Sequence, residues 1–339
     1  MNKIFGFLML AFLLIACETT EERRDRFFNL GNQALNDGYY EQAIDFYDQS
    51  LKAQPDYAPA INNRGVARIE SDHPYEAILD YNKALQLSPQ YLDALFNRAF
   101  AYEEIGQFEN ALKDINTIHT LVQDSAFVYF YEGLVQTKLR KYDDALENFL
   151  KADSLDPVNP ETIINMATIF YFQKDYEQAK RLVNDALNLS QNDANAFNLL
   201  SLIELESGNY QAALSEINRA LDVVPEEAYF LNNRGYIYLQ MDSLNLAIED
   251  INRSIVLNPK NGWAYRNKGI YLSRLERYDE AINLFNRALK TGEFIDEIYF
   301  YLGEAHMKQG NKDKACGTWG KGAELNESAS SMMLDQNCD

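Results

Sequence analysis

The sequence is poor in residues that interrupt helices. Its 339 residues include only 16 Gly and 8 Pro, whereas it contains 22 Tyr and 19 Phe, and 47% of its residues are hydrophobic. Many aromatic residues with few helix breakers favour a mostly helical protein. The length is sufficient for two ordinary domains.

Positive charge is also scarce. The chain has 31 Lys and Arg against 51 Asp and Glu, which gives a formal net charge of -20. Phosphate binding needs clustered cations, so the balance argues against a nucleic-acid ligand, and equally against a soluble face lying on an anionic membrane. The acidity is typical of a solvated surface kept soluble by self-repulsion, and it would also steer a basic partner toward the chain.

Residues for catalysis and metal binding are few. The three His residues, His73, His119 and His306, are not spaced as ligands with another His, a Cys or a carboxylate cluster. The sequence has no Gly-rich phosphate loop and no nucleophile elbow. We therefore expect no metal, no cofactor and no enzymatic activity.

The N-terminus carries a short apolar run. Residues 4–16 are uncharged and follow Lys3, but a helix of this length reaches only about 20 Å, short of the roughly 30 Å hydrocarbon core. The run therefore indicates a signal peptide. It ends in Leu14-Ile15-Ala16-Cys17, which resembles the lipobox of bacterial lipoproteins.

The lipobox resemblance implies that residues 1–16 are removed, that Cys17 is acylated and becomes the N-terminus, and that residues 17–23 are a lipidated tether. Several acyl chains anchor a protein stably to a membrane. The alternative is an ordinary secretory leader with a Cys there by chance. The expected location is the bacterial cell envelope, at the outer membrane.

An acidic segment, Glu18-Thr19-Thr20-Glu21-Glu22, follows the Cys. It loosely resembles the acidic surface-export signals of some Bacteroidetes lipoproteins. It also fits a helix N-terminus capped by Thr20, with acidic residues in the first turn. Both interpretations stay open, and so does the choice between the periplasmic and the surface face.

A period of 34 residues runs through the rest of the chain. Ala recurs at 43, 77, 111, 145, 179, 213, 247, 281 and 315. Twelve residues before each Ala the residue is small, and four residues after each it is bulky and apolar. Prolines at 55, 89, 157, 225 and 259 punctuate the units, and Gly38, Gly106 and Gly208 mark turns inside them. The spacing predicts two helices per unit, with small residues where helix backbones approach closely.

This pattern resembles the tetratricopeptide repeat (TPR) family over residues 24–329. The resemblance implies an all-α fold, a right-handed α-solenoid of nine hairpins with starts near 24, 58, 92, 126, 160, 194, 228, 262 and 296. Such repeats bury their faces only against neighbours, so we expect residues 323–339 to form a capping helix and tail.

In TPR proteins the first helix of each hairpin lines a concave groove, and its sixth position is often Asn. Here six of the nine sixth positions are Asn: Asn29, Asn63, Asn97, Asn165, Asn233 and Asn267. An amide can donate to and accept from a peptide backbone, and the arrangement resembles the asparagine ladder of a TPR-containing glycosyltransferase that holds extended peptides. The alternative is that Asn is only the repeat consensus.

Aromatic residues neighbour these Asn positions and are expected to anchor a partner, although some should belong to the core. They are Phe28, Phe96, Phe100, Phe127, Phe130, Tyr171, Phe172, Tyr229, Tyr236, Trp263 and Phe300. The carboxylate clamp of chaperone cofactors needs groove cations, but Phe28, Asp93 and Asn97 stand at those positions. A C-terminal carboxylate is therefore not the expected ligand.

Two further pairings are predicted. Three repeats carry Arg at the seventh position and Asp sixteen residues later, which predicts ion pairs inside each hairpin: Arg64 with Asp80, Arg98 with Asp114, and Arg234 with Asp250. Cys316 and Cys338 could form a disulfide in an oxidising compartment, or could remain a buried thiol and a frayed tail.

Together these features predict an envelope lipoprotein that acts as a scaffold or adaptor and binds a protein or peptide in the groove. The acidic charge would favour a partner of basic character. The alternative is a surface lipoprotein that captures peptides or glycans for nutrient uptake. A purely structural spacer would have a polar groove, which the aromatic residues disfavour.

Overall fold

The computed structural model describes residues 18–292 and 294–338, and in these ranges the protein consists of helices without strands. The predicted signal peptide and Cys17 lie outside the described residues. The helices are α1 (Thr20–Asn36), α2 (Tyr40–Ala53), α3 (Ala58–Glu70), α4 (Pro74–Leu87), α5 (Leu92–Glu104), α6 (Phe108–Leu121), α7 (Ala126–Lys138), α8 (Tyr142–Leu155), α9 (Pro160–Phe172), α10 (Tyr176–Leu189), α11 (Ala194–Glu206), α12 (Tyr210–Val223), α13 (Ala228–Gln240), α14 (Leu244–Leu257), α15 (Gly262–Arg274), α16 (Tyr278–Leu289), α17 (Ile298–Lys308), α18 (Lys312–Glu324) and α19 (Ser328–Asn337).

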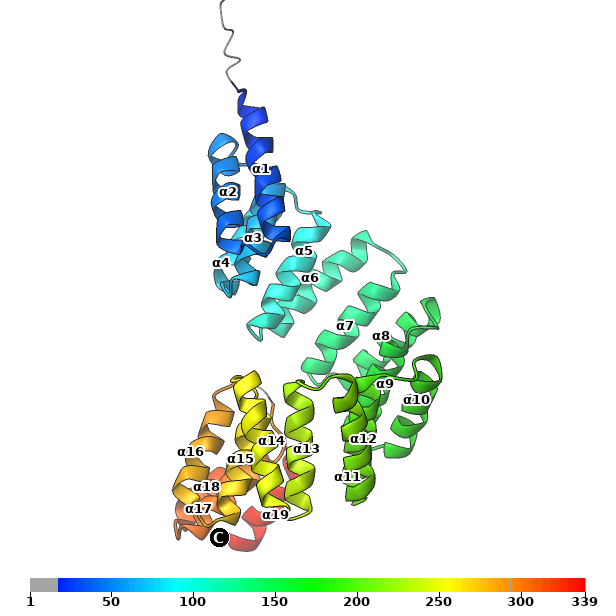
Figure 1. Ribbon diagram of the computed structural model, residues 1–339, viewed down its shortest axis with the longest axis vertical. Coiled ribbons are helices and arrows are strands. Elements are labelled where there is room, and N and C mark those ends of the chain that lie inside the picture. The colour runs from blue at the N-terminus through cyan, green and yellow to red at the C-terminus, as the bar shows by residue number, and fades with distance from the viewer. Residues whose placement is uncertain (1–17, 293, 339) are drawn as a thin grey trace, which may run out of the picture. The chain divides into compact units, whose positions relative to one another are not determined.

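The chain divides into two compact units, residues 1–140 and 141–339. The first contains the hairpins α1/α2, α3/α4 and α5/α6 followed by α7 (Figure 1). The second contains α8, the five hairpins from α9/α10 to α17/α18, and α19. The all-α architecture of repeated helical hairpins expected from the sequence is confirmed. No helix in the described ranges is both long and apolar enough to cross a membrane.

The helix starts follow the 34-residue period, with differences at the two ends. Helix α1 begins at Thr20, so residues 20–23, expected to belong to the tether, are helical. The helix starts early because Thr19 and Glu22 form a capping box: the Glu22 amide donates to the Thr19 hydroxyl (3.1 Å) and the Thr19 amide to the Glu22 carboxylate (2.8 Å). The cap is therefore Thr19 and not Thr20.

The turn between the two helices of each repeat has a residue in the left-handed backbone conformation at the same position. Nine residues in phase have positive φ: Gly38, Asp72, Gly106, Arg140, Lys174, Gly208, Asp242, Glu276 and Gly310. Gly adopts this conformation at little cost, whereas the other residues are strained there. The period, rather than the Gly itself, therefore marks the turn.

Gly residues at the small position pack directly against the bulky residue on the second helix of the same hairpin. A Cβ added at Gly65 would lie 2.5 Å from Cε1 of Tyr81, and one at Gly269 would lie 2.5 Å from Cε1 of Phe285. Tyr81 and Phe285 are fully buried. Gly on the first helix thus forms the hollow that receives an aromatic ring from the second.

The sequence repeats this size matching. Every aromatic residue at the bulky position follows a Gly sixteen residues earlier, whereas Ala99, Ala167 and Ser201 precede the aliphatic Ile115, Val183 and Ile217. Gly235 with Ile251 is the one Gly that precedes an aliphatic residue. The volume lost on one helix is restored on the other, as close packing requires.

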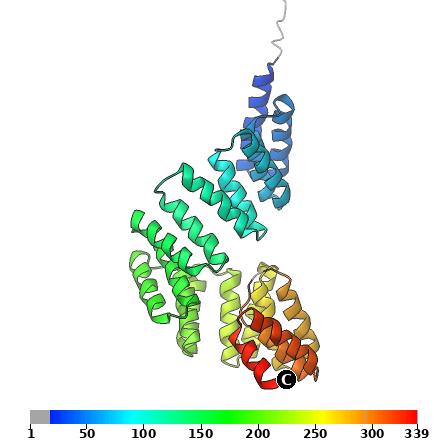
Figure 2. The ribbon, with the colours of Figure 1, turned by 180° about the vertical axis from the view of Figure 1, so that it is seen from behind.

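The C-terminal end of the array is closed by α19, which packs on α17 and α18 (Figure 2). Residues 323–339 were expected to form this cap, but α18 continues to Glu324 and the capping helix begins only at Ser328. Asn326 adopts the left-handed conformation that reverses the chain between them. A Cβ at Gly322 would overlap the Ser330 hydroxyl, so the cap approaches α18 closely there.

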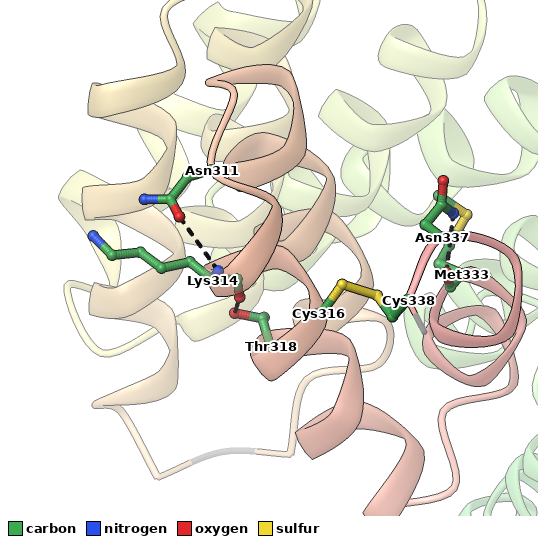
Figure 3. The surroundings of a disulfide bond; sticks show 7 residues. All are labelled: Asn311, Lys314, Cys316, Thr318, Met333, Asn337 and Cys338. Carbon is green, nitrogen blue, oxygen red and sulfur yellow. Dashed lines mark hydrogen bonds between the residues drawn. A yellow bond between two sulfur atoms is a disulfide. The ribbon is translucent and has the colours of Figure 1, made fainter.

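A disulfide and the hydrogen bonds of Glu327 fasten the cap. Cys316 on α18 and Cys338 after α19 form a disulfide with a Cα–Cα distance of 5.8 Å (Figure 3). The buried Glu327 carboxylate accepts from the Ser330 hydroxyl (2.7 Å) and from the Phe300 amide (3.2 Å) at the start of α17. Glu327 therefore satisfies a free amide of the first turn of α17 while it ties α19 to that turn.

Candidate partner-binding surface

The predicted binding residues lie on the first helices of the hairpins, and we call the surface of these helices the first-helix face. In the first unit it comprises α1, α3, α5 and α7, and in the second α9, α11, α13, α15 and α17. The two parts are described separately below.

In the first unit, side-chain amides join successive first helices. Asn97 donates from Nδ2 to Oδ1 of Asn62 (3.1 Å), Asn62 donates to Asn63 (3.0 Å), and Asn63 donates to Asn32 (2.9 Å). The Tyr47 hydroxyl also donates to Asn32 (2.8 Å). These bonds form one relay that runs from α5 through α3 to α1.

The second unit repeats this relay on α15, α13 and α11. Asn267 donates to Asn232 (2.8 Å), Asn232 to Asn233 (3.2 Å), and Asn233 to Asn198 (2.8 Å). Asn232 and Asn267 are buried, with exposed fractions of 2% and 1%. The amides therefore first satisfy one another, as buried polar groups must.

The two remaining predicted Asn residues stand outside the relays. Asn165 donates to the Glu161 carbonyl of its own helix (2.9 Å), and Asn29 is exposed. The prediction considered only the sixth position of each repeat and so missed half of the relay residues. The residues that accept from the sixth-position Asn side chains are Asn62, Asn198 and Asn232 at the fifth position and Asn32 at the ninth. The Asn-Asn dipeptides at 62–63 and 232–233 were the signal in the sequence.

Four aromatic rings gather on α5 and α7, and we call Phe96, Phe100, Phe127 and Tyr131 the α5–α7 aromatic cluster. The ring of Tyr131 stacks on Phe100 (centroids 5.8 Å apart) and on Phe127 (6.3 Å), and Phe96 lies 5.6 Å from Phe127. Tyr131 is buried, but Phe100 and Phe127 are 56% and 59% exposed. The cluster thus presents two phenyl faces to solvent above a buried ring.

Most of the other predicted groove aromatics are half-buried. Phe28 packs on Tyr57 (5.2 Å, edge to face) and on the core of the first hairpins, and Tyr236 and Trp263 border the core of the second unit. Phe130 is half-buried as well. Among Phe28, Phe96, Phe100, Phe130, Tyr236 and Trp263, only Phe100 is exposed, because these positions face both the groove and the neighbouring repeat.

Arg266 of α15 is enclosed by three aromatic rings, and we call Tyr236, Trp263 and Tyr301 the Arg266 cage. Its guanidinium carbon lies 4.7 Å from the centroid of Trp263, 4.9 Å from Tyr236 and 5.8 Å from Tyr301. Its nitrogens donate to Oδ1 of Asn267 (2.9 and 3.0 Å) and to the Asp296 carbonyl (2.9 Å). The buried guanidinium is thus surrounded by aromatic faces and by hydrogen-bond acceptors.

Carboxylates beside these rings have perturbed acidity. Burial raises the pKa of Glu103 on α5, opposed by the charge of Lys138 and by the Tyr131 hydroxyl. Desolvation, followed by the charges of Glu297 and Asp296, raises the pKa of Glu206 on α11. Glu103 is thus a half-buried carboxylate near a cation, whereas Glu206 is crowded by other carboxylates.

The three predicted Arg–Asp pairs each form two-pronged ion pairs between the helices of one hairpin. Arg234 contacts Asp250 at 2.6 and 2.8 Å, Arg98 contacts Asp114 at 2.6 and 2.8 Å, and Arg64 contacts Asp80 at 2.5 and 2.9 Å. The three Asp side chains are buried. Burial makes these pairs structural elements rather than surface ion pairs of little weight.

All three Arg residues also reach the preceding hairpin, and Arg64 does so by donating to Asp48 of α2. Arg234 donates to Asn218 (3.0 Å) and Arg98 to Asn82 (2.6 Å). Each Arg thus fixes its own hairpin and its contact with the one before. Among residues 18–292 and 294–338, no cluster of His, Cys, Asp or Glu could hold a metal ion.

Family models described as tetratricopeptide repeat or TPR repeat match residues 25–57, 75–106, 137–203, 198–262 and 266–330. These matches cover most of the chain, so the protein belongs to the tetratricopeptide repeat family. No curated protein matches it in sequence.

Solved structures share the fold. A chain of the APC/C hetero-tetramer Cut9-Hcn1 is similar with 15% identity and a TM-score of 0.58, covering 96% of this chain and 78% of that one. PilF of Pseudomonas aeruginosa is similar with 23% identity and a TM-score of 0.51, covering 62% of this chain and 96% of that one. At these identities the likeness establishes the fold alone.

Proposed function

We propose that this TPR protein is a non-catalytic envelope lipoprotein that acts as an interaction scaffold and binds a partner segment on its first-helix face. The observation that carries the proposal is the α5–α7 aromatic cluster. In it Phe100 and Phe127 each expose more than half of their surface, and each contacts another ring of the cluster. Exposed aromatic residues anchor interfaces because they bury large area at low entropic cost.

The lipid anchor is the second part of the proposal. The lipobox-like sequence ending at Cys17 supports it, and α1 begins only three residues later, at Thr20. That segment spans at most about 10 Å, so an acylated Cys17 would hold the first hairpin against its membrane. Labelling cells with a radioactive fatty acid tests this. Wild type should incorporate the label and Cys17→Ala should not, whereas label in both variants would refute acylation at this residue.

Binding on the first-helix face is tested by site-specific photocrosslinking in the native cell. A photoreactive residue at Phe100 should crosslink to a discrete protein or peptide. The matched control places it at Leu150 on the second helix α8, which is 54% exposed. Equal labelling from both positions would contradict the proposal, and a saccharide crosslinked at Phe100 would instead support ligand capture for nutrient uptake.

A further inference from the structure

The Arg266 cage and the α5–α7 aromatic cluster occupy equivalent positions of the repeat. Phe100 lies four repeats before Tyr236, Phe127 four repeats before Trp263, and Phe130 four repeats before Arg266. Helix pairs α5 and α7 in the first unit thus correspond to α13 and α15 in the second. Two aromatic positions are shared, and the cation between them is not.

In the second unit, this pair of positions holds a guanidinium. Tyr236 and Trp263 lie 4.9 and 4.7 Å from the Arg266 guanidinium carbon, and Arg266 is only 5% exposed. A guanidinium within about 6 Å of an aromatic centroid is attracted to the face of the ring. The chain itself therefore shows which chemical group these two repeat positions can hold.

In the first unit, no Arg fills the equivalent place. Phe130 stands where Arg266 would, and Phe100 and Phe127 remain 56% and 59% exposed. Tyr131 lies against both rings from the buried side. Each phenyl ring is thus stacked on Tyr131 and still more than half exposed.

The charge around the cluster favours a cation. Asp93, Phe96, Phe100 and Glu103 follow one face of α5 at helical spacing. Glu103 lies three residues after Phe100 on this face and is half-buried, and the positive charge of Lys138 acts on its carboxylate. Asp93 is exposed at the other end of the row.

We propose that Phe100 and Phe127 bind an arginine side chain of the partner segment, as Tyr236 and Trp263 bind Arg266, with Glu103 as its counter-charge. This inference rests on the proposed function and names the chemistry that the partner presents. It is specific to arginine because the planar guanidinium stacks on aromatic faces and pairs with a carboxylate at once.

The test is a binding titration of the purified full chain with a fluorescent Gly/Ser peptide that carries Arg. The same peptide with citrulline, which keeps the planar group but loses the charge, is the ligand control. Loss of a cation–π contact corresponds to roughly 5- to 30-fold weaker binding, and we expect this loss both with citrulline and in the Phe100→Leu/Phe127→Leu variant. Binding of the Arg peptide should also weaken with salt.

Two variants complete the design. Tyr75→Leu changes an exposed aromatic residue of α4, a second helix outside the first-helix face, and should bind the Arg peptide like wild type. Phe130→Arg places an Arg in the first unit at the position equivalent to Arg266, and this internal Arg should block binding of the peptide. Circular dichroism verifies that each variant folds. Equal affinity for the Arg and citrulline peptides, or unchanged affinity in the double Leu variant, would overturn the inference. If photocrosslinking at Phe100 still captures a partner while the Arg peptide does not bind, the scaffold function stands and the arginine specificity fails.

Discussion

Asn267 donates a hydrogen bond from Nδ2 to Oδ1 of Asn232, 2.8 Å away on the preceding first helix. Both side chains are buried. A residue type expected to grip a peptide is therefore engaged in joining one repeat to the next. The same arrangement between Asn97 and Asn62 shows that this is a property of the array.

Replacing Asn232 by Ala should lower the free energy of unfolding by about 1–3 kcal/mol, because the buried Asn267 amide loses its acceptor. Asn165→Ala is the control, since that amide bonds only to a carbonyl of its own helix; it should change stability much less. Urea denaturation followed by circular dichroism measures both. Similar losses in the two variants would show that the relay adds nothing beyond a single Asn.

Gly269→Ala should destabilise the protein by roughly 1–3 kcal/mol, because the new Cβ would overlap the ring of Phe285. Adding Phe285→Ile should recover part of this loss, since Ala99 and Ile115 already form such a pair. Gly320→Ala meets no atom within 4 Å and should be neutral or stabilising. Denaturation of the three variants tests the size matching, and failure of the double variant to recover would contradict it.

Asp250→Asn should lower stability by roughly 1–3 kcal/mol, because it leaves the half-buried Arg234 without its counter-ion. Glu280→Gln is the comparison: it breaks the exposed pair with Arg277 and should leave the unfolding midpoint unchanged. Thermal melts at low and high salt separate the two. A large salt-sensitive loss in Glu280→Gln, with none in Asp250→Asn, would reverse this ranking.

Glu206→Gln should stabilise the protein at pH 7. The pKa of Glu206 is raised in the folded state by desolvation and by Glu297 and Asp296, so stability falls as pH rises from the ordinary Glu pKa of 4.5 through the folded pKa. The gain over wild type should therefore vanish below pH 4.5. Glu204 lies two residues earlier and has a lowered pKa through its hydrogen bond with Lys180.

Glu204→Gln should accordingly destabilise at pH 7, and its deficit should shrink as pH falls through the lowered pKa. Melting temperatures of both variants across about pH 3–7, which spans both perturbed pKa values, check these opposite signs. A parallel pH dependence in the two variants would show that neither carboxylate titrates as its surroundings require.

Reducing the Cys316–Cys338 disulfide should loosen the cap. The bond closes a loop of 22 residues, and the chain-entropy model assigns it about 3 kcal/mol. Because repeats contact only their neighbours, hydrogen exchange should rise in α17–α19 and remain unchanged in α9–α12. A Cys316→Ser/Cys338→Ser variant should behave like reduced protein, and equal protection with and without reductant would show that Glu327 and packing hold the cap alone.

The sequence by itself determined the repeats. The 34-residue period, with small and bulky residues sixteen apart, requires paired helices because only that geometry brings each Gly against its partner ring. It also indicated the Arg–Asp pairings, because the three repeats with Arg at the seventh position also carry Asp sixteen residues later, and opposite charges on facing helices pair. The start of α1 was missed because a local capping box, Thr19 with Glu22, adds a turn outside the period.

Only the tertiary structure decided how the first-helix face is used. The Asn-Asn dipeptide at 62–63 signals the relay, but its bonds to Asn97 and Asn32 form only when adjacent repeats stack. Likewise, Phe100 and Tyr236 occupy the same repeat position, but one is exposed and the other flanks an Arg. The neighbour that covers each side chain comes from another repeat, and its placement depends on packing rather than on the period.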